Sequence, residues 1–185
     1  MARIKNKEMW QEVVVAEKIH PWYLVSNHGN IISRLTSKDK QMKLDYHNGR
    51  TSYKLYFPID FFVGTSHDGY DYAIHGKNKD KVRKNVYIHQ LVMHTFKPLE
   101  LFPPDELKDC WHMIPNPAKN WIKNTITINH IDHNPFNNHI SNLEYVTQMQ
   151  NSRKAIEFYG GKFANKNTNE NLNNSIHTLE SFIYG

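Results

Sequence analysis

The stretch TITINHIDHNPFNNHISNLEYVTQMQNSRKAIEFY, residues 125–159, decides the fold of the second half of the chain. Residues 125–128 alternate polar and apolar side chains as a strand does, and residues 143–146 offer a second strand. Between them, residues 132–138 are polar and contain Pro135, which indicates a loop. The stretch therefore predicts two strands joined by a polar loop.

A helix is expected directly after the second strand, because Thr147 and Gln150 have the spacing of a capping box. The Thr147 hydroxyl can accept a hydrogen bond from the Gln150 amide, while the Gln150 side chain reaches back. We predict that the helix starts at Gln148, carries Met149 and Ile156 on one stripe, and ends at Gly160-Gly161.

The segments upstream indicate small antiparallel sheets. Residues 23–26 and 31–33 flank the polar sequence NHGN at 27–30, which predicts a hairpin. Residues 43–62 and 69–74 are rich in Tyr, Phe, Ile and Val and are broken by turn residues, as in a small antiparallel sheet.

The middle of the chain gives weaker signals. Residues 75–85 predict a basic loop, and residues 86–89 a strand that runs into a helix ended by Pro98. The proline-rich residues 99–124 predict a loop with one helical turn near Asp105 to Asp109. We expect two tryptophans of this loop to pack on the core, Trp111 and Trp121.

Composition favours a folded protein with a polyanionic partner. The net charge is +5 and the pI about 9.1, and Lys and Arg that neutralise phosphates release condensed counterions. Residues 1–60 carry ten Lys or Arg and six acids, whereas residues 129–185 carry four and five, so the N-terminal half is expected to hold such a partner.

Other compositional features exclude some classes of protein and site. The single cysteine, Cys110, excludes an intramolecular disulfide and a zinc site of paired cysteines. No segment has the pattern of a membrane span or of a secretory signal. We therefore expect an intracellular, cytoplasmic protein.

The sequence INHIDHNPFNNHISNLEYVTQMQN, residues 128–151, resembles the HNH motif of ββα-metal nucleases, above all the phage and intron-encoded homing endonucleases. Residues 86–96, VYIHQLVMHTF, resemble the strand and helix that precede the motif there. MWQEVVV and WYLVSNHGNIISRL resemble the N-terminal modular domain that those nucleases often carry. Together the resemblances cover roughly residues 9 to 155.

The expected fold class is α+β, a β-rich antiparallel region followed by a ββα-metal motif. We expect three parts along the chain. Residues 1–84 form a β-rich DNA-binding region, residues 85–160 the HNH nuclease domain, and residues 161–185 a linker and a short helix.

The chemistry that such a site needs can be stated from the residues. Hydrolysis of a phosphodiester requires an activated water and a cation that neutralises growing negative charge. A histidine with a pKa near 6.5 can take the proton of that water near neutral pH, and His130 is the candidate base. The resemblance implies that Asn142 accepts a hydrogen bond from the His130 ring and holds its tautomer.

The resemblance also implies that Asn129 and Asn151 flank a Mg²⁺ or Mn²⁺ ion. Hard cations prefer oxygen ligands and keep several waters, so one or two protein oxygens and a phosphate suffice. The chain departs from one common pattern, because the residue before the catalytic histidine is often Asp or His. The amide of Asn129 is a weaker ligand than a carboxylate, which predicts low metal affinity.

The expected partner is double-stranded DNA. A cluster of four basic residues follows the predicted hairpin. A hairpin is a two-stranded ribbon, which is narrow enough to enter a major groove of DNA. Two basic residues on the predicted helix are candidates for holding the scissile phosphate. A monomer has one such site and would nick one strand. The candidate DNA-binding residues are Arg34, Lys38, Lys40, Lys43, Arg153 and Lys154.

Two alternatives stay open. The chain could be a DNA-binding protein with an HNH fold and little cleavage activity, which Asn129 in place of a carboxylate motivates. It could also be a nuclease of low specificity that serves genome packaging or host defence. Binding without cleavage under any divalent ion would indicate the first, and mapped cut sites on phage and host DNA would separate the second.

Overall fold

The computed structural model describes residues 7–47, 50–75 and 79–163. The fold class is α+β, as the sequence predicts, with antiparallel sheets upstream and three α-helices among these residues. The chain divides into two compact units, Met1–Val146 and Thr147–Gly185. No helix in the described part combines the length and apolar character that crossing a membrane requires.

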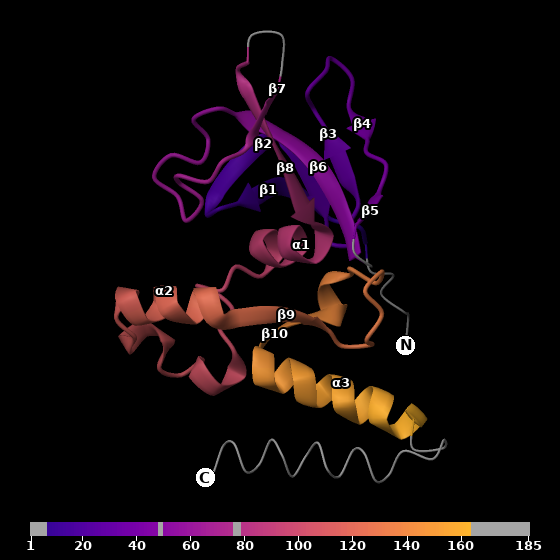
Figure 1. The fold of residues 1–185 in the computed structure, drawn as a ribbon, viewed down its shortest axis with the longest axis vertical. Helices are drawn as coiled ribbons and strands as arrows, with labels where there is room; N and C mark the ends of the chain where they lie inside the picture. Colours follow the sequence, from indigo (N-terminus) through magenta and orange to yellow (C-terminus); the bar gives the residue numbers. More distant parts are fainter. Residues whose placement is uncertain (1–6, 48–49, 76–78, 164–185) are drawn as a thin grey trace. The chain divides into compact units, whose positions relative to one another are not determined.

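Two four-stranded antiparallel sheets make up the N-terminal part of the first unit (Figure 1). The predicted hairpin is confirmed, since Tyr23 pairs with Ser33 and Val25 with Ile31. The first sheet runs in chain order and contains β1 (Trp10–Val15), β2 (Lys18–Ser26), β3 (Ile31–Ser33) and β4 (Lys40–Gln41). The second has the order β5 (Asp45–His47), β6 (Arg50–Pro58), β8 (Lys81–Tyr87) and β7 (Ala73–His75).

The prediction of a basic loop over residues 75–85 is wrong in its second half, because β8 begins at Lys81. Val82 and Val86 are buried, and the whole of β8 pairs with β6. The burial of the two valines and the pairing with β6 hold this segment in the sheet in spite of the charged residues around them.

Helix α1 (Ile88–Phe96) lies between the N-terminal strands and the remaining two strands, β9 (Ile126–His130) and β10 (Leu143–Thr147), which form a two-stranded sheet (Figure 1). It contacts β1, β2, β6 and β8, and also β9 and the short helix η3 (Ile140–Asn142). Its buried side chains join one apolar core with strand residues such as Tyr23, Leu55 and Phe57; they are Ile88, Leu91, Val92 and Met93. The helix thereby connects the sheets to the segment that contains His130.

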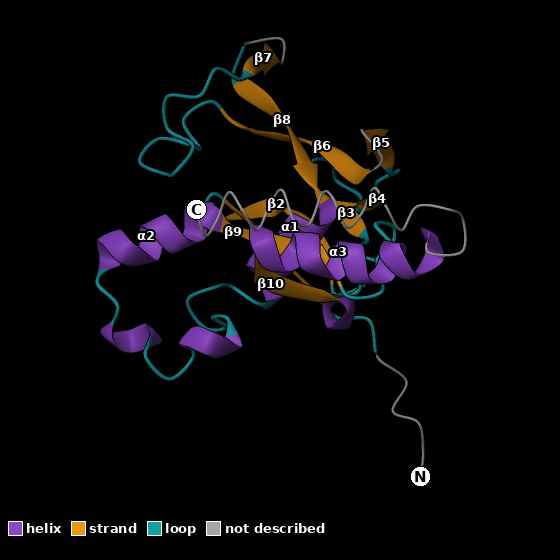
Figure 2. Ribbon diagram, turned by 60° about the horizontal axis from the view of Figure 1, so that its bottom comes forward, coloured by secondary structure: helices purple, strands orange, loops and turns teal. Residues whose placement is uncertain are grey.

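Residues 99–125 contain more helix than the sequence indicated. The expected turn is η1 (Asp105–Leu107), but η2 (Trp111–Met113) and α2 (Asn116–Thr125) follow it. Pro117 lies in the first turn of α2, where a missing N–H costs nothing, so the prolines that suggested a loop also start a helix. These helices lie together at the starting end of β9 (Figure 2).

The two tryptophans of this segment have different environments. Trp111 is buried as expected, and its indole N–H donates to Glu100 Oε2 at 3.0 Å. Glu100 also pairs with Lys119 and Lys123 of α2. The expectation that Trp121 packs on the core is wrong, because 68% of its surface is exposed.

In the second unit, α3 (Gln148–Phe163) starts at the predicted residue. The capping box is formed, since Thr147 Oγ1 accepts from the Gln150 N–H at 3.2 Å and the Thr147 N–H donates to Gln150 Oε1 at 2.8 Å. The N–H groups of Thr147 and Gln150, which have no backbone acceptor at the start of a helix, are both hydrogen-bonded in this way.

The predicted end of this helix at Gly160-Gly161 is wrong, because α3 continues to Phe163. A glycine inside a helix costs only about 1 kcal/mol and does not by itself end it. The expected linker beyond Phe163 and the short helix expected over residues 175–184 lie outside the described residues.

His20 is a buried polar side chain in the core of the first unit, with 1% of its surface exposed. Its Nδ1 accepts from the Trp22 N–H at 3.2 Å, and aromatic rings of Phe57 and Phe61 pack on it. Its Nε2 has no hydrogen-bond partner among the described residues. Burial therefore lowers the pKa of His20 to about 4.

The free energy of unfolding should fall by about 3 kcal/mol on account of His20 as pH falls from about 6.5 to 4. The unfolded chain binds a proton at the ordinary histidine pKa, whereas the folded protein does so only near pH 4. Urea unfolding at pH 7 and pH 5 measures the effect. His20→Gln should reduce this pH dependence, and the exposed-site control His112→Gln should not; equal pH dependence in all three proteins would refute the assignment.

Candidate active site

His130 is the last residue of β9, where the chain leaves the sheet and enters the polar loop that the sequence predicts. The ring is half-buried. Its Nε2 lies 3.2 Å from Asn138 Oδ1. Within the described residues no partner contacts the other ring nitrogen, Nδ1.

Asn138 fixes the tautomer of the His130 ring. Its Nδ2 donates to the Phe136 carbonyl at 3.2 Å, and a carbonyl can only accept. The amide oxygen of Asn138 must therefore face His130, so Nε2 carries the proton and Nδ1 has the lone pair. The ring presents its basic nitrogen on the side away from Asn138.

Asn138 is itself held by the N-terminal sheets. It is buried, with 4% of its surface exposed, and its Nδ2 also donates to Thr51 Oγ1 on β6 at 2.9 Å. Thr51 is equally buried. A hydrogen bond between two buried side chains 87 residues apart thus connects β6 to the candidate base.

The turn between β2 and β3 packs against the same loop. The Ile140 N–H donates to the Asn27 carbonyl at 2.8 Å, and the rings of His28 and His139 meet at 4.7 Å. Gly29 has φ of +88°, and a Cβ built there would lie 3.0 Å from Asn138 Cβ and 2.8 Å from Ile88 Cγ2. Glycine is needed for both the backbone angle and this close approach.

The structure corrects the expected role of Asn142, because Asn138 and not Asn142 bonds the His130 ring. Asn142 closes the loop instead: its Oδ1 accepts from the Asp132 N–H, and its Nδ2 donates to Asp132 Oδ1 and to the Asn137 carbonyl, both at 2.8 Å.

Asp132 serves as the turn cap, accepting the Asn134 N–H. Burial alone would raise the pKa of Asp132, but hydrogen bonds to its carboxylate from the Asn137 side chain, the Asn134 N–H and the Asn142 side chain hold it below its usual range.

Electrostatics favour a neutral His130. Burial lowers its pKa, and the nearby guanidinium of Arg50 adds to this, against opposing contributions from Asn138 and Asp132. His89 of α1 packs edge-on against the ring, with centroids 5.4 Å apart. Burial lowers the pKa of His89 to about 3, so it too is neutral at pH 7.

Asn129 lies beside His130 on β9 and is buried. Its Nδ2 donates to Glu144 Oε1 on β10 at 2.7 Å. This contact orients the amide and leaves the Asn129 oxygen as the atom that can approach a cation. It also brings a carboxylate close to Asn129, at a position that the sequence did not single out. No group of three or more His, Cys, Asp or Glu suited to a metal occurs in the described ranges.

The other predicted metal and phosphate residues, Asn151, Arg153 and Lys154, lie on α3 in the second unit. Asn151 is the fourth residue of the helix, directly after the capping box. The roles of these three residues remain predictions.

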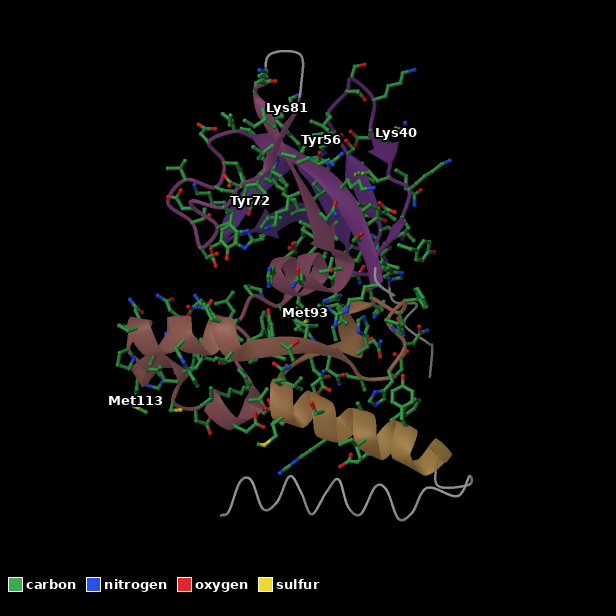
Figure 3. All side chains as sticks on the ribbon, viewed as in Figure 1. Lys40, Tyr56, Tyr72, Lys81, Met93 and Met113 are labelled. Carbon is green, nitrogen blue, oxygen red and sulfur yellow. The ribbon has the colours of Figure 1, made fainter. Side chains whose placement is uncertain are left out.

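The predicted basic cluster lies on β4 and in the segments that precede and follow it, and its four side chains are exposed. Arg34 is 3.7 Å from Glu12, and Lys40 stands on β4 at the end of the first sheet away from α1 and β9 (Figure 3). No hydrogen bond, ion pair or ring contact joins these four side chains to His130 within the described residues. The cluster consists of Arg34, Lys38, Lys40 and Lys43.

Comparison with known proteins gives one distant likeness. No protein-family model and no curated protein matches the chain. A solved structure described as "DNA binding and cleavage by the HNH homing endonuclease I-HmuI" aligns with a TM-score of 0.46 and 18% identity. The alignment covers 80% of this chain and 58% of that one, so this chain spans under two thirds of its length.

Proposed function

We propose that the protein is a metal-dependent HNH endonuclease of the homing type, which acts as a monomer and nicks double-stranded DNA. The observation that carries the proposal is the His130 ring, neutral, held in one tautomer by Asn138, and offering Nδ1 at the end of β9. This is the arrangement that a general base requires. The resemblance of residues 128–151 to the HNH motif points to the same chemistry.

The chain's own residues perform the proton transfer. His130 Nδ1 takes a proton from a water molecule as that water attacks phosphorus. A new P–O bond forms while one ester P–O bond breaks, and the leaving oxygen takes a proton from solvent water. Asn138 stabilises the resulting imidazolium, since its oxygen accepts from Nε2. His130 later returns its own proton to the solvent.

A divalent cation fits the donor chemistry of this region. Amide oxygens are hard ligands of the kind that Mg²⁺ and Mn²⁺ prefer, and Asn129 is oriented by Glu144 to offer one. In this proposal Asn129 and Asn151 hold the ion. The cation would supply stabilisation of negative charge on the phosphate and the leaving oxygen.

The basic cluster around β4 is the proposed DNA-binding surface. Its lysines are exposed, and contacts from exposed Lys and Arg to phosphate act without regard to sequence. In this proposal Arg153 and Lys154 hold the scissile phosphate from α3.

A DNA-binding protein with little cleavage activity is the second candidate. The amide of Asn129, in place of a carboxylate, and its engagement with Glu144 favour it. This candidate predicts salt-sensitive DNA binding with no nicking at any divalent ion.

Purified protein should convert supercoiled plasmid to open circles in Mg²⁺ or Mn²⁺, and excess chelator should stop the reaction. Gel electrophoresis separates the two plasmid forms, while a linear product would indicate cutting of both strands. A plasmid that stays supercoiled in every divalent ion, although the protein binds it, would reject the endonuclease and favour the second candidate.

A further inference from the structure

Four side chains form a continuous column that ends on His130. The Arg50 guanidinium carbon lies 5.6 Å above the Tyr87 ring centroid, and the Tyr87 ring stacks on His89 at 5.7 Å. His89 then meets His130 edge-on at 5.4 Å. The register of the sheet explains the first contact, because Ser52, two residues after Arg50, is the cross-strand partner of Tyr87.

The β5–β6 ribbon approaches the loop after His130 through two further contacts. Thr51, the residue after Arg50, holds Asn138 by the buried hydrogen bond described above. Tyr46, the cross-strand partner of Thr51, lies with its ring 6.0 Å from that of Phe136. The start of β6 is therefore packed against the candidate active site and is not a remote part of the sheet.

Arg50 carries a charge that the described protein does not neutralise. Its side chain is exposed, and no carboxylate in the described residues forms an ion pair with it. Burial lowers the pKa of both His89 and His130, and the positive charge of Arg50 adds to this lowering. A guanidinium stacked on an aromatic ring keeps its N–H donors in a fixed plane.

We propose that Arg50 binds the scissile phosphate at the site of His130, supplied by the N-terminal sheet. This inference rests on the proposed function. The fork of N–H donors matches two phosphate oxygens, and its charge offsets the charge that grows on them as water attacks. Tyr87 and His89 position the guanidinium and the base relative to each other through the column.

The test measures the single-turnover rate of plasmid nicking at saturating full-length protein in Mg²⁺, together with DNA affinity in chelator. Arg50→Gln should lower the rate by about 100-fold and change the affinity by no more than about threefold. Arg50→Lys keeps the charge without the planar fork and should give an intermediate rate. Unfolding midpoints of all variants show whether the fold is intact.

Lys54→Gln is the matched control. Lys54 lies on the same strand as Arg50, and its substitution removes the same charge, but Lys54 is paired with Asp45 at 2.6 Å. Its rate should stay within about threefold of wild type. The role of Arg50 is overturned, with the proposed function left standing, in either of two cases. Arg50→Gln nicks at the wild-type rate, or Lys54→Gln is slowed as much as Arg50→Gln. Wild-type protein that nicks with no divalent ion overturns the proposed function and this role with it.

Discussion

His130→Ala should lower the single-turnover rate of plasmid nicking by about 100- to 10,000-fold, the range that a general base contributes. The substitution removes Nδ1, the ring nitrogen that has no hydrogen-bond partner among the described residues and that we propose takes the proton of the attacking water. It also leaves Asn138 Oδ1 without its hydrogen bond from the ring, which should cost about 1–3 kcal/mol of stability.

The measurement compares wild type, His130→Ala and His112→Ala on the same supercoiled plasmid. His112 lies on η2 and is exposed, so its variant should nick at the wild-type rate. Affinity for DNA in chelator should be similar in all three proteins, since a neutral ring contributes no charge to phosphate binding. Metal-dependent nicking by His130→Ala at a rate near wild type would show that another group is the base.

Gly29→Ala is expected to destabilise the protein by about 2–5 kcal/mol. The left-handed backbone at φ +88° costs a residue with Cβ about 1–2 kcal/mol, and overpacking of a filled core costs about 1–3 kcal/mol more. The added carbon would meet Ile88 at 2.8 Å and Asn138 at 3.0 Å. Movement of Asn138 should also release the His130 ring and slow nicking.

Gly69→Ala separates the two costs. Gly69 has a similar backbone angle, φ +79°, but a Cβ there meets nothing within 4 Å. This variant should therefore show only the backbone cost and the wild-type nicking rate. Urea unfolding and the plasmid assay measure both quantities. Equal stability of the two variants would mean that the contact with Asn138 and Ile88 carries no energy.

Local signals predicted the parts of the fold that depend on neighbouring residues. The capping box of Thr147 and Gln150 and the hairpin around NHGN need only short-range spacing, and both are found. The helix α2 was missed because the prolines of residues 99–124 suggested a loop. Trp121 was misplaced because aromatic character indicates burial only on average.

The candidate site shows the same division. The histidine at the end of β9 and the asparagines around it could be identified from the motif. Which asparagine bonds the ring could not be identified, because Asn138 and Asn142 lie four residues apart between β9 and β10, and Asn138 is held by Thr51, far upstream in the sequence. Arg50 and His89 carried no local signal, since their relation to His130 is created by sheet pairing and helix packing.

The hydrogen bond between Thr51 and Asn138 also has a consequence for when the candidate active site can form during synthesis of the chain. The chain emerges N-terminus first, so β6 is available long before the loop that carries Asn138. In a growing or truncated chain that lacks Thr51 or Asn138, the hydrogen bonds that orient the His130 ring cannot both form. We expect a fragment that begins after β6 to contain the entire motif and yet to remain inert, so that cutting activity appears only when synthesis of the first unit is complete.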